Sequence, residues 1–329
     1  MSPSERQHRF RVILAFGLVY VLWGSTYLGI RIAIDDIPPA TLAGVRFLIA
    51  GVVMLAVCAA TGRRIALTRR DFLRVGSVGV LLLTGGNVLV CWSEQYVASG
   101  LAALIVAFVP IWVVVIEALI LRHERLSGRG LFGLGLGIGG LLVLLWPRLQ
   151  AGTLGGRMEL IGALALVLAS LSWATGSVSS RRWKLEVDVF VSTAWQMVIA
   201  GVVDLALGFA LGETGRIQWT IKGIGATAYL IVAGSWVGHT AYIWLLNHVP
   251  TQKVATYAYV NPVVAVFLGW LVLQERVDGY IIAGASIILA AVALVNTSGI
   301  VKTGQAEPAL AAVQPEPAAA LSGCEPLAD

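Results

Sequence analysis

The sequence predicts an all-α membrane protein with ten transmembrane helices in two inverted five-helix repeats. Its mean hydropathy is +0.84 and 12% of its residues are charged, whereas soluble domains have roughly 25% charged residues. Apolar runs of about 20 residues, the length of helix that crosses a lipid bilayer, recur along the chain. Rare residues also recur at a nearly constant spacing, which indicates that one five-helix unit occurs twice.

The duplication is best seen in Trp, Pro and charged residues, because matched Val and Ala mean little in a chain that is 58% hydrophobic. Members of each pair are separated by 150 to 152 residues. The pairs are Trp23 and Trp173, Arg31 and Arg181, Trp92 and Trp244, Pro110 and Pro262, and Glu124-Arg125 and Glu275-Arg276.

The apolar runs place the helices, in order, at residues 12–30, 40–60, 72–92, 99–121, 130–147, 158–180, 189–211, 223–246, 252–274 and 279–296. The first run is too long for a signal-peptide core and no A-x-A site follows it, so we expect it to remain as a span. Residues 1–11 then form a cytoplasmic N-terminus, 12–147 the first repeat and 158–296 the second. Residues 297–329 are rich in Ala, Pro and Glu and predict a disordered cytoplasmic tail.

Basic residues set the predicted orientation. With the N-terminus in the cytoplasm, most Lys and Arg, including Arg63, Arg64, Arg122 and Arg182, fall on the cytoplasmic side, as the positive-inside rule requires. The C-terminus is then cytoplasmic as well. Because each repeat has an odd number of helices, the second repeat enters the membrane from the opposite side. Inverted repeats of this kind support alternating access in transporters.

Pro110 and Pro262 fall near the middle of the fourth and ninth predicted helices. Each removes a backbone donor, and such breaks in membrane helices usually face protein or a water-filled cavity. We expect both prolines, with the neighbouring Asn261, to border a substrate pathway. A packing kink without substrate contact is the alternative.

Polar and aromatic residues within the predicted spans are the other candidates for the pathway. Arg46 suits an anionic group such as a carboxylate, although an internal pair or snorkelling is an equally simple explanation. Its repeat mate is Gln196, and Asn87 is the mate of His239. Trp23, Trp173, Tyr257 and Tyr259 present aromatic faces that suit an apolar or aromatic substrate.

Three titratable residues within spans are candidates for proton coupling. His239 titrates near neutral pH in water, and Glu117 and Asp204 are acidic residues well inside spans. A hydrogen bond between helices is the alternative role for each of them.

Several chemistries have no support in the sequence. Gly135-x-Gly137-x-x-Gly140 matches a dinucleotide fingerprint but has no strand before it, so close helix packing explains it better. We find no metal-binding spacing, nucleophile elbow or P-loop, and expect no metal, cofactor or catalytic residue. The charge of +5 forms no continuous patch, so we expect a lipid bilayer and a small molecule as partners and no nucleic acid. The small residues Gly137, Gly140, Gly284 and Ala291 fit packing within a monomer or across a homodimer.

The segments WGSTYLGIRIAI, PPATLAGVRFLIAG, HERLSG and QERVDG resemble the drug/metabolite transporter superfamily, in particular its EamA-domain family. The resemblance covers residues 12–296. It implies ten helices in two inverted repeats, a central cavity, and export of small metabolites across the cell inner membrane. Its motif positions are Trp23, Gly24, Arg46, Pro110, Glu124, Pro262 and Glu275; we expect Glu124 and Glu275 to fix the loops beside them.

The predicted function is secondary transport: export of amino acids or of amphiphilic and aromatic compounds by alternating access. An intramembrane enzyme, or a channel or sensor that moves no solute, is the alternative. The substrate, the coupling ion and the direction of transport stay open at this point.

Overall fold

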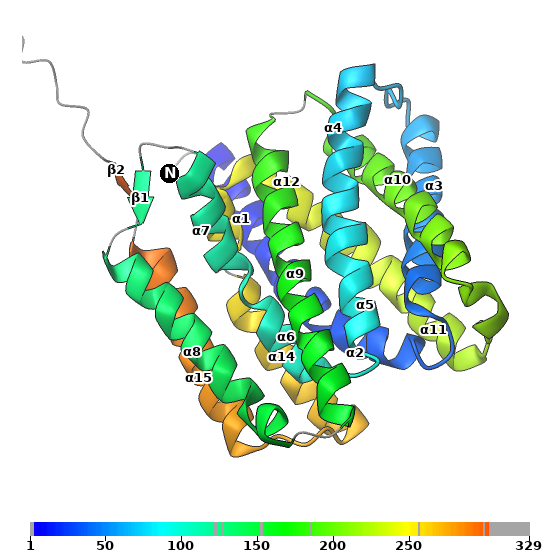
Figure 1. The fold of residues 1–329 in the computed structure, drawn as a ribbon. Helices are drawn as coiled ribbons and strands as arrows, with labels where there is room; N and C mark the ends of the chain where they lie inside the picture. The colour runs from blue at the N-terminus through cyan, green and yellow to red at the C-terminus, as the bar shows by residue number, and fades with distance from the viewer. Residues whose placement is uncertain are drawn as a thin grey trace, which may run out of the picture.

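The computed structural model describes residues 3–120, 124–126, 128–151, 154–183, 186–255, 257–298 and 300–302. They form a bundle of helices (Figure 1). The helices are α1 (Pro3–Leu18), α2 (Gly24–Ala33), α3 (Pro39–Ala60), α4 (Arg69–Gly79), α5 (Leu89–Ser93), α6 (Ser99–Val106), α7 (Val109–Ile120), α8 (Gly128–Ala151), α9 (Leu154–Arg182), α10 (Val189–Ala210), α11 (Ile221–Tyr229), α12 (Thr240–His248), α13 (Thr251–Val254), α14 (Tyr257–Leu273) and α15 (Gly279–Ser298).

Wider π-helical segments join some of these helices into long rods. Val19–Trp23 joins α1 to α2, Val80–Val88 joins α4 to α5, and Leu230–His239 joins α11 to α12. The last two begin 150 residues apart, at matched positions of the two sequence units. π-Helical turns are uncommon and are often found at functional sites.

Most of the long rods can cross a membrane. In the ranges that the structure describes, seven helical stretches are long and apolar enough to do so: Glu5–Ala33, Pro39–Ala60, Arg69–Ser93, Ser99–Glu117, Gly156–Arg182, Val189–Ala210 and Ile221–His248. Val260–Leu273 and Gly279–Ala291 are shorter apolar helices. Helices lie within every sequence range predicted above, and the protein is a multi-pass membrane protein.

A two-stranded antiparallel ribbon departs from the predicted all-α fold. Strand β1 (Glu124–Leu126) pairs with β2 (Ile300–Lys302) in the register Glu124 with Lys302. The predicted tail was expected to begin at residue 297, but α15 continues to Ser298 and β2 follows it. β-Branched Ile300 and Val301 favour extended backbone, and the segment that follows α7 supplies the partner hydrogen bonds. Residues 303–329 of that predicted tail lie outside the described residues.

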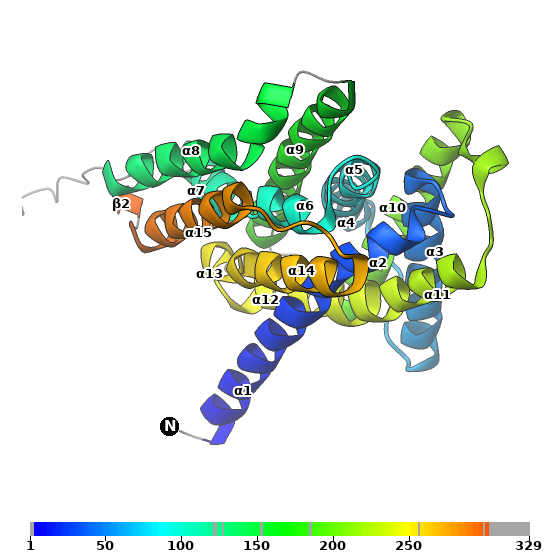
Figure 2. The same cartoon turned by 90° about the horizontal axis from the view of Figure 1, so that it is seen from below.

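Helices α3 and α10 pack closely at one side of the bundle, opposite the α8–α15 pair (Figures 1 and 2). A Cβ added to Gly51 would lie 2.7 Å from the Val198 backbone N, and one added to Gly201 would lie 2.5 Å from the Leu48 N. Residue numbers fall along one helix as they rise along the other, so the two helices run antiparallel. Gly51 and Gly201 are matched positions, as are Leu48 and Val198, and the same contact therefore occurs twice.

The α8–α15 pair repeats this arrangement. A Cβ at Gly140 would lie 2.9 Å from Ile288, and one at Gly137 would lie 3.5 Å from the Ala291 Cβ. These small residues pack within one chain. The GxGxxG sequence therefore lies in a helix and lets α15 approach, as expected for small residues in membrane helices.

The two prolines break their helices differently from the prediction. Pro110 lies in the first turn of α7, after a break at residues 107–108, where a helix needs no backbone donor. Pro262 lies inside α14, and the interruption comes earlier, between Val254 and Tyr257. The expected kink at the proline itself is replaced, in both cases, by a break on its N-terminal side.

One end of the bundle, the lower end in Figure 1, carries the loops at residues 34–38, 94–98, 211–220 and 274–278. Hydrogen bonds join two of these loops, at residues 211–220 and 274–278, to helices of the other sequence unit. Glu213, 3% exposed, accepts from the Thr41 N and Oγ1 at 2.7 and 2.9 Å. Glu275 accepts from the Ser99 N and Oγ at 2.9 and 2.8 Å. We expected Glu275 to fix its own loop; instead it caps the N-terminus of α6. The Glu124 side chain lies outside what the structure describes.

Candidate functional site

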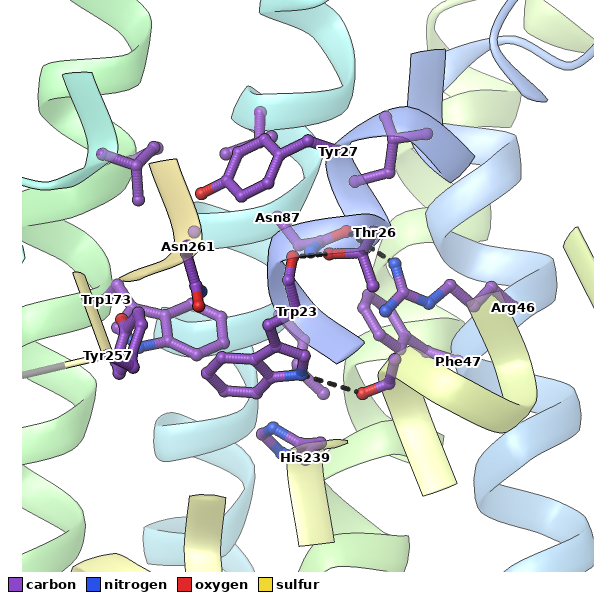
Figure 3. A pocket seen from close by; sticks show the side chains of 17 residues that line it. Trp23, Thr26, Tyr27, Arg46, Phe47, Asn87, Trp173, His239, Tyr257 and Asn261 are labelled. Atoms are coloured by element: carbon purple, nitrogen blue, oxygen red, sulfur yellow. Dashed lines mark hydrogen bonds between the residues drawn. The ribbon is translucent and has the colours of Figure 1, made fainter. Parts of the chain in front are cut away.

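A central cavity of about 60 Å³ lies between α2, α3, α5, α6, α9, α14 and the π-helical segments (Figure 3). It is lined by Trp23, Thr26, Tyr27, Ile30, Arg46, Phe47, Leu83, Gly86, Asn87, Val90, Val106, Ala169, Trp173, Gly234, His239, Tyr257 and Asn261. Both sequence units contribute residues. Site cavities for small molecules usually measure about 300–1,000 Å³, so this conformation encloses room for only a few waters.

Arg46 is the charged residue of this cavity, and it is 3% exposed. Its Nε donates to the Ser235 Oγ at 2.9 Å and its Nη1 to the Asn87 Oδ1 at 3.4 Å. The guanidinium also lies 4.7 Å from the Phe47 ring centroid. Within the described ranges, no carboxylate oxygen forms an ion pair with it.

Gly234 makes room for this guanidinium. A Cβ at Gly234 would collide with the Arg46 Nη2 and would lie 3.0 Å from the Thr26 Cγ2. No protein acceptor for Nη2 is recorded among the described residues. A buried cation with neutral partners is costly unless an anion compensates it, so the cavity is electrostatically suited to an anionic group.

Four aromatic side chains form a cluster at one wall of the cavity. Trp23 lies at its centre, with ring-centroid distances of 5.3 Å to Trp173, 4.8 Å to Tyr242 and 5.4 Å to Tyr257. The Trp23 Nε1 donates to the Gly234 O at 3.1 Å, and the Trp173 Nε1 donates to the Tyr242 Oη at 3.0 Å. The polar atoms of Trp23, Trp173 and Tyr242 are bonded to protein, so the cluster offers apolar ring faces.

His239 lies below Trp23 in Figure 3 and is 2% exposed. Its Nε2 is 3.1 Å from the Gln196 Oε1, while the Gln196 Nε2 donates to the Ser192 Oγ at 3.2 Å. Because the amide oxygen accepts, the imidazole proton lies on Nε2 and Nδ1 carries a lone pair. Nδ1 has no hydrogen-bond partner in the part of the chain that is described.

Asn261 closes the cavity on the α14 side. With its amide oriented to satisfy its neighbours, the nitrogen donates to the Tyr20 O at 3.0 Å and to the Tyr257 O at 3.3 Å. The bond to Tyr20 connects α14 to the π-helical turn of the first rod, where the backbone ladder is irregular.

The structure brings seven of the predicted pathway residues to the cavity: Trp23, Arg46, Asn87, Trp173, His239, Tyr257 and Asn261. Gln196 is one hydrogen bond away, behind His239. Pro110 and Pro262 do not line the cavity, and Pro262 faces an apolar groove on α14 and α15 instead. Val106, one helical turn before Pro110, and Asn261, directly before Pro262, line the cavity in place of the prolines.

Two of the proton-coupling candidates lie away from the cavity lining. Asp204 on α10 is fully buried, and neither of its carboxylate oxygens has a hydrogen-bond partner among the described residues. Glu117 on α7 is half-buried. The Tyr259 side chain lies outside what the structure describes. In the described ranges, no group of three or more His, Cys, Asp or Glu side chains is arranged to hold a metal ion.

Sequence reasoning missed Tyr27, Tyr242 and Glu94. Tyr27 lies one helical turn after Trp23, a spacing that predicts a shared face. Tyr242 lies three residues after His239 and bonds to Ser177 and Trp173. Glu94 lies just beyond the predicted span 72–92 and therefore reads as a loop residue, yet it is 1% exposed.

Comparison with known proteins agrees with this architecture. The model of the EamA-like transporter family matches residues 10–146 and again 160–297. The chain is 37% identical to "Uncharacterized inner membrane transporter YedA" of Escherichia coli K12, over 79% of this chain and 84% of that one. It is 25% identical to "Probable amino-acid metabolite efflux pump" of E. coli K12, over 83% and 90%.

A solved crystal structure shares the fold, with a TM-score of 0.64 at 19% identity, and the match covers 86% of this chain and 96% of that one. The two family matches together span most of the sequence, and a relative above 30% identity covers more than two thirds of it. The protein belongs to the EamA-like transporter family.

Proposed function

We propose that this transporter exports small metabolites that carry a carboxylate, amino acids first and amphiphilic or aromatic compounds second. The observation that carries the proposal is Arg46, a buried cation with neutral partners that faces an aromatic cavity. A substrate carboxylate supplies the missing anion by a charge-assisted hydrogen bond. Its apolar part packs against the rings of Trp23, Trp173 and Tyr257. The relative named as an amino-acid metabolite efflux pump agrees with this substrate class.

The transport mechanism in this proposal is alternating access between two inverted five-helix repeats, at residues 12–147 and 158–296. The matched antiparallel contacts of α3 with α10 and of α8 with α15 support an inverted relationship. Left-handed Gly62 and Gly212, with φ of 75° and 67°, end α3 and α10 at matched positions. Arg63 pairs with Asp188 at the start of α10, while its mate Glu213 binds the start of α3.

In this proposal the chain has ten spans and both termini are cytoplasmic. The lower end of Figure 1 then faces the outer side of the cell inner membrane. The conformation that encloses the cavity of about 60 Å³ is then an occluded state, between an inward-open and an outward-open state. Rocking of one repeat against the other enlarges the cavity on one side at a time. A proton gradient is the proposed energy source, with His239, Asp204 and Glu117 as the candidate carriers.

Counterflow in proteoliposomes tests the proposal. Vesicles loaded with an unlabelled amino acid should accumulate the labelled compound, and the same compound as an amide should be a poor substrate. Absence of counterflow for a broad panel of amino acids and for aromatic acids would contradict the proposed substrate class. If the transport rate is unaffected by a pH gradient and by the change His239→Gln, His239 does not couple proton movement to transport.

A further inference from the structure

Glu94 is a buried carboxyl group at the lower end of the bundle, in the turn between α5 and α6. It is 1% exposed, and neither carboxylate oxygen has a hydrogen-bond partner among the described residues. An isolated buried carboxylate is strongly disfavoured, and such a group takes up a proton instead.

The position of Glu94 connects it to the cavity. Its backbone N donates to the Val90 O at 3.0 Å, so it lies one helical turn beyond Val90 on the same face. Val90 and Asn87 both line the cavity, and Asn87 accepts from Arg46. Glu94 therefore continues the cavity-facing stripe of this rod toward the lower end, where the structure covers it completely.

The groups that face Glu94 come from several elements. Burial and the charge of Glu275, in the loop after α14, raise the pKa of Glu94 well above its ordinary value, while Arg31 on α2 lowers it. The charge of Glu94 also acts on two further side chains, Tyr27 on α2 and Cys91 on α5. At this same end, Glu275 accepts hydrogen bonds from the N-terminus of α6 and Glu213 from that of α3.

We propose that Glu94 is a proton-binding site at the outer end of the cavity, and that binding of a proton there closes that end. This proposal rests on the proposed function for two points: the orientation of the chain in the membrane and the existence of inward-open and outward-open states. In the closed state the neutral acid is buried; when the end opens, water reaches the group and it ionises. Closing therefore takes up a proton, so acidic medium outside favours the closed end and alkaline medium favours the open one.

Cys91 is a natural reporter of this opening. It is fully buried beside Asn87, one turn from Glu94 on the neighbouring face. With Cys58 and Cys324 changed to Ser in the full chain, an impermeant maleimide added outside should react with Cys91 only when the lower end opens. Dividing the labelling rate of the Glu94 protein by that of Glu94→Gln at each pH cancels the pH dependence of the thiol itself.

The rate ratio should be lowest at about pH 5.5, where buried Glu94 is neutral and the closed end is most favoured, and should rise about tenfold or more by about pH 8. Glu186→Gln, which changes an exposed carboxylate, should follow the unmodified protein at both values. Arg31→Gln should move the closing transition to higher pH, because it removes the cation that favours ionised Glu94. Arg31→Gln should therefore label more slowly than the unmodified protein near the transition. A loss of folding would instead expose Cys91 and speed up labelling at every pH.

A ratio that does not change with pH, or Cys91 that never reacts in either protein, overturns the Glu94 proposal. Counterflow of amino acids is measured separately at a single pH. If counterflow is present and the ratio is flat, the transport function stands and Glu94 is structural. If the ratio rises as expected without amino-acid counterflow, the gate stands and the substrate assignment fails.

Discussion

In the proposed function, Arg46 is the residue that recognises the carboxylate of the substrate. Arg46→Gln removes the cation and replaces the guanidinium donors to Ser235 and Asn87 with one neutral amide, so binding of the anionic part of the substrate should weaken. A hydrogen bond to a charged group is worth about 1.5–3 kcal/mol, which predicts a roughly 10- to 100-fold weaker apparent affinity for amino acids in proteoliposome uptake.

The same variant should lose most of the discrimination between an amino acid and its amide. Arg216→Gln, which alters an exposed arginine at the lower end, is the matched control and should change neither value. Unchanged discrimination in Arg46→Gln would show that another group receives the carboxylate.

His239 is a residue whose two ring nitrogens have different environments. Its Nε2 is bonded to Gln196, and Nδ1 is unpartnered among the described residues. If His239 carries protons, His239→Gln should preserve counterflow without a gradient but lose the stimulation by an imposed pH gradient. Uptake that responds to the gradient equally in both proteins would point to Asp204 or Glu117.

At the scale of elements, the close contact between α3 and α10 depends on glycine. A Cβ at Gly201 would lie 2.5 Å from a backbone N, whereas one at Gly225 on α11 meets nothing within 4 Å. Gly201→Ala should lower the free energy of unfolding by about 1–3 kcal/mol through overpacking. Gly225→Ala should leave it unchanged or raise it by about 0.5–1 kcal/mol through backbone entropy. Thermal unfolding in detergent measures both, and equal midpoints would contradict the packing argument.

A carboxylate cap joins elements of the two sequence units at the start of α6. Glu275 accepts from the Ser99 N, the Ser99 Oγ and the Gly100 N. Glu275→Gln retains the size of the side chain but loses the charge that favours a helix N-terminus, and should cost about 1–2 kcal/mol of stability. Hydrogen exchange should then be faster at Ser99 and Gly100, with α3, capped by Glu213, as the internal control.

At the scale of the whole molecule, the proposed inverted repeat predicts from which side of the membrane each loop can be reached. Arg64 and Thr214 are exposed residues at matched positions after α3 and α10. In a protein otherwise free of cysteine, Arg64→Cys should react with an impermeant thiol reagent only from the cytoplasmic side and Thr214→Cys only from outside. Labelling of both from one side would replace the inverted repeat with a parallel one.

The sequence by itself determined the membrane class, the duplication, the family and seven of the residues that line the cavity. Hydropathy and the spacing of rare residues can be read directly from the chain, and polar or aromatic side chains inside apolar runs are few enough to identify individually. Trp23, Arg46, Asn87 and His239 were found in this way. The π-helical segments, the ribbon of β1 with β2 and the helix breaks before the prolines left no comparable pattern.

The tertiary structure alone decided which groups meet across the chain. Glu275 caps α6 from a point 176 residues away, and Glu94 is buried by neighbours from other rods although it follows a predicted span end. Burial and pairing depend on which helix faces converge, and a single sequence carries that information only through long-range packing. For the same reason Arg46 read as either a snorkelling residue or an internal pair, until the fold placed it between Ser235 and Asn87 beside the cavity.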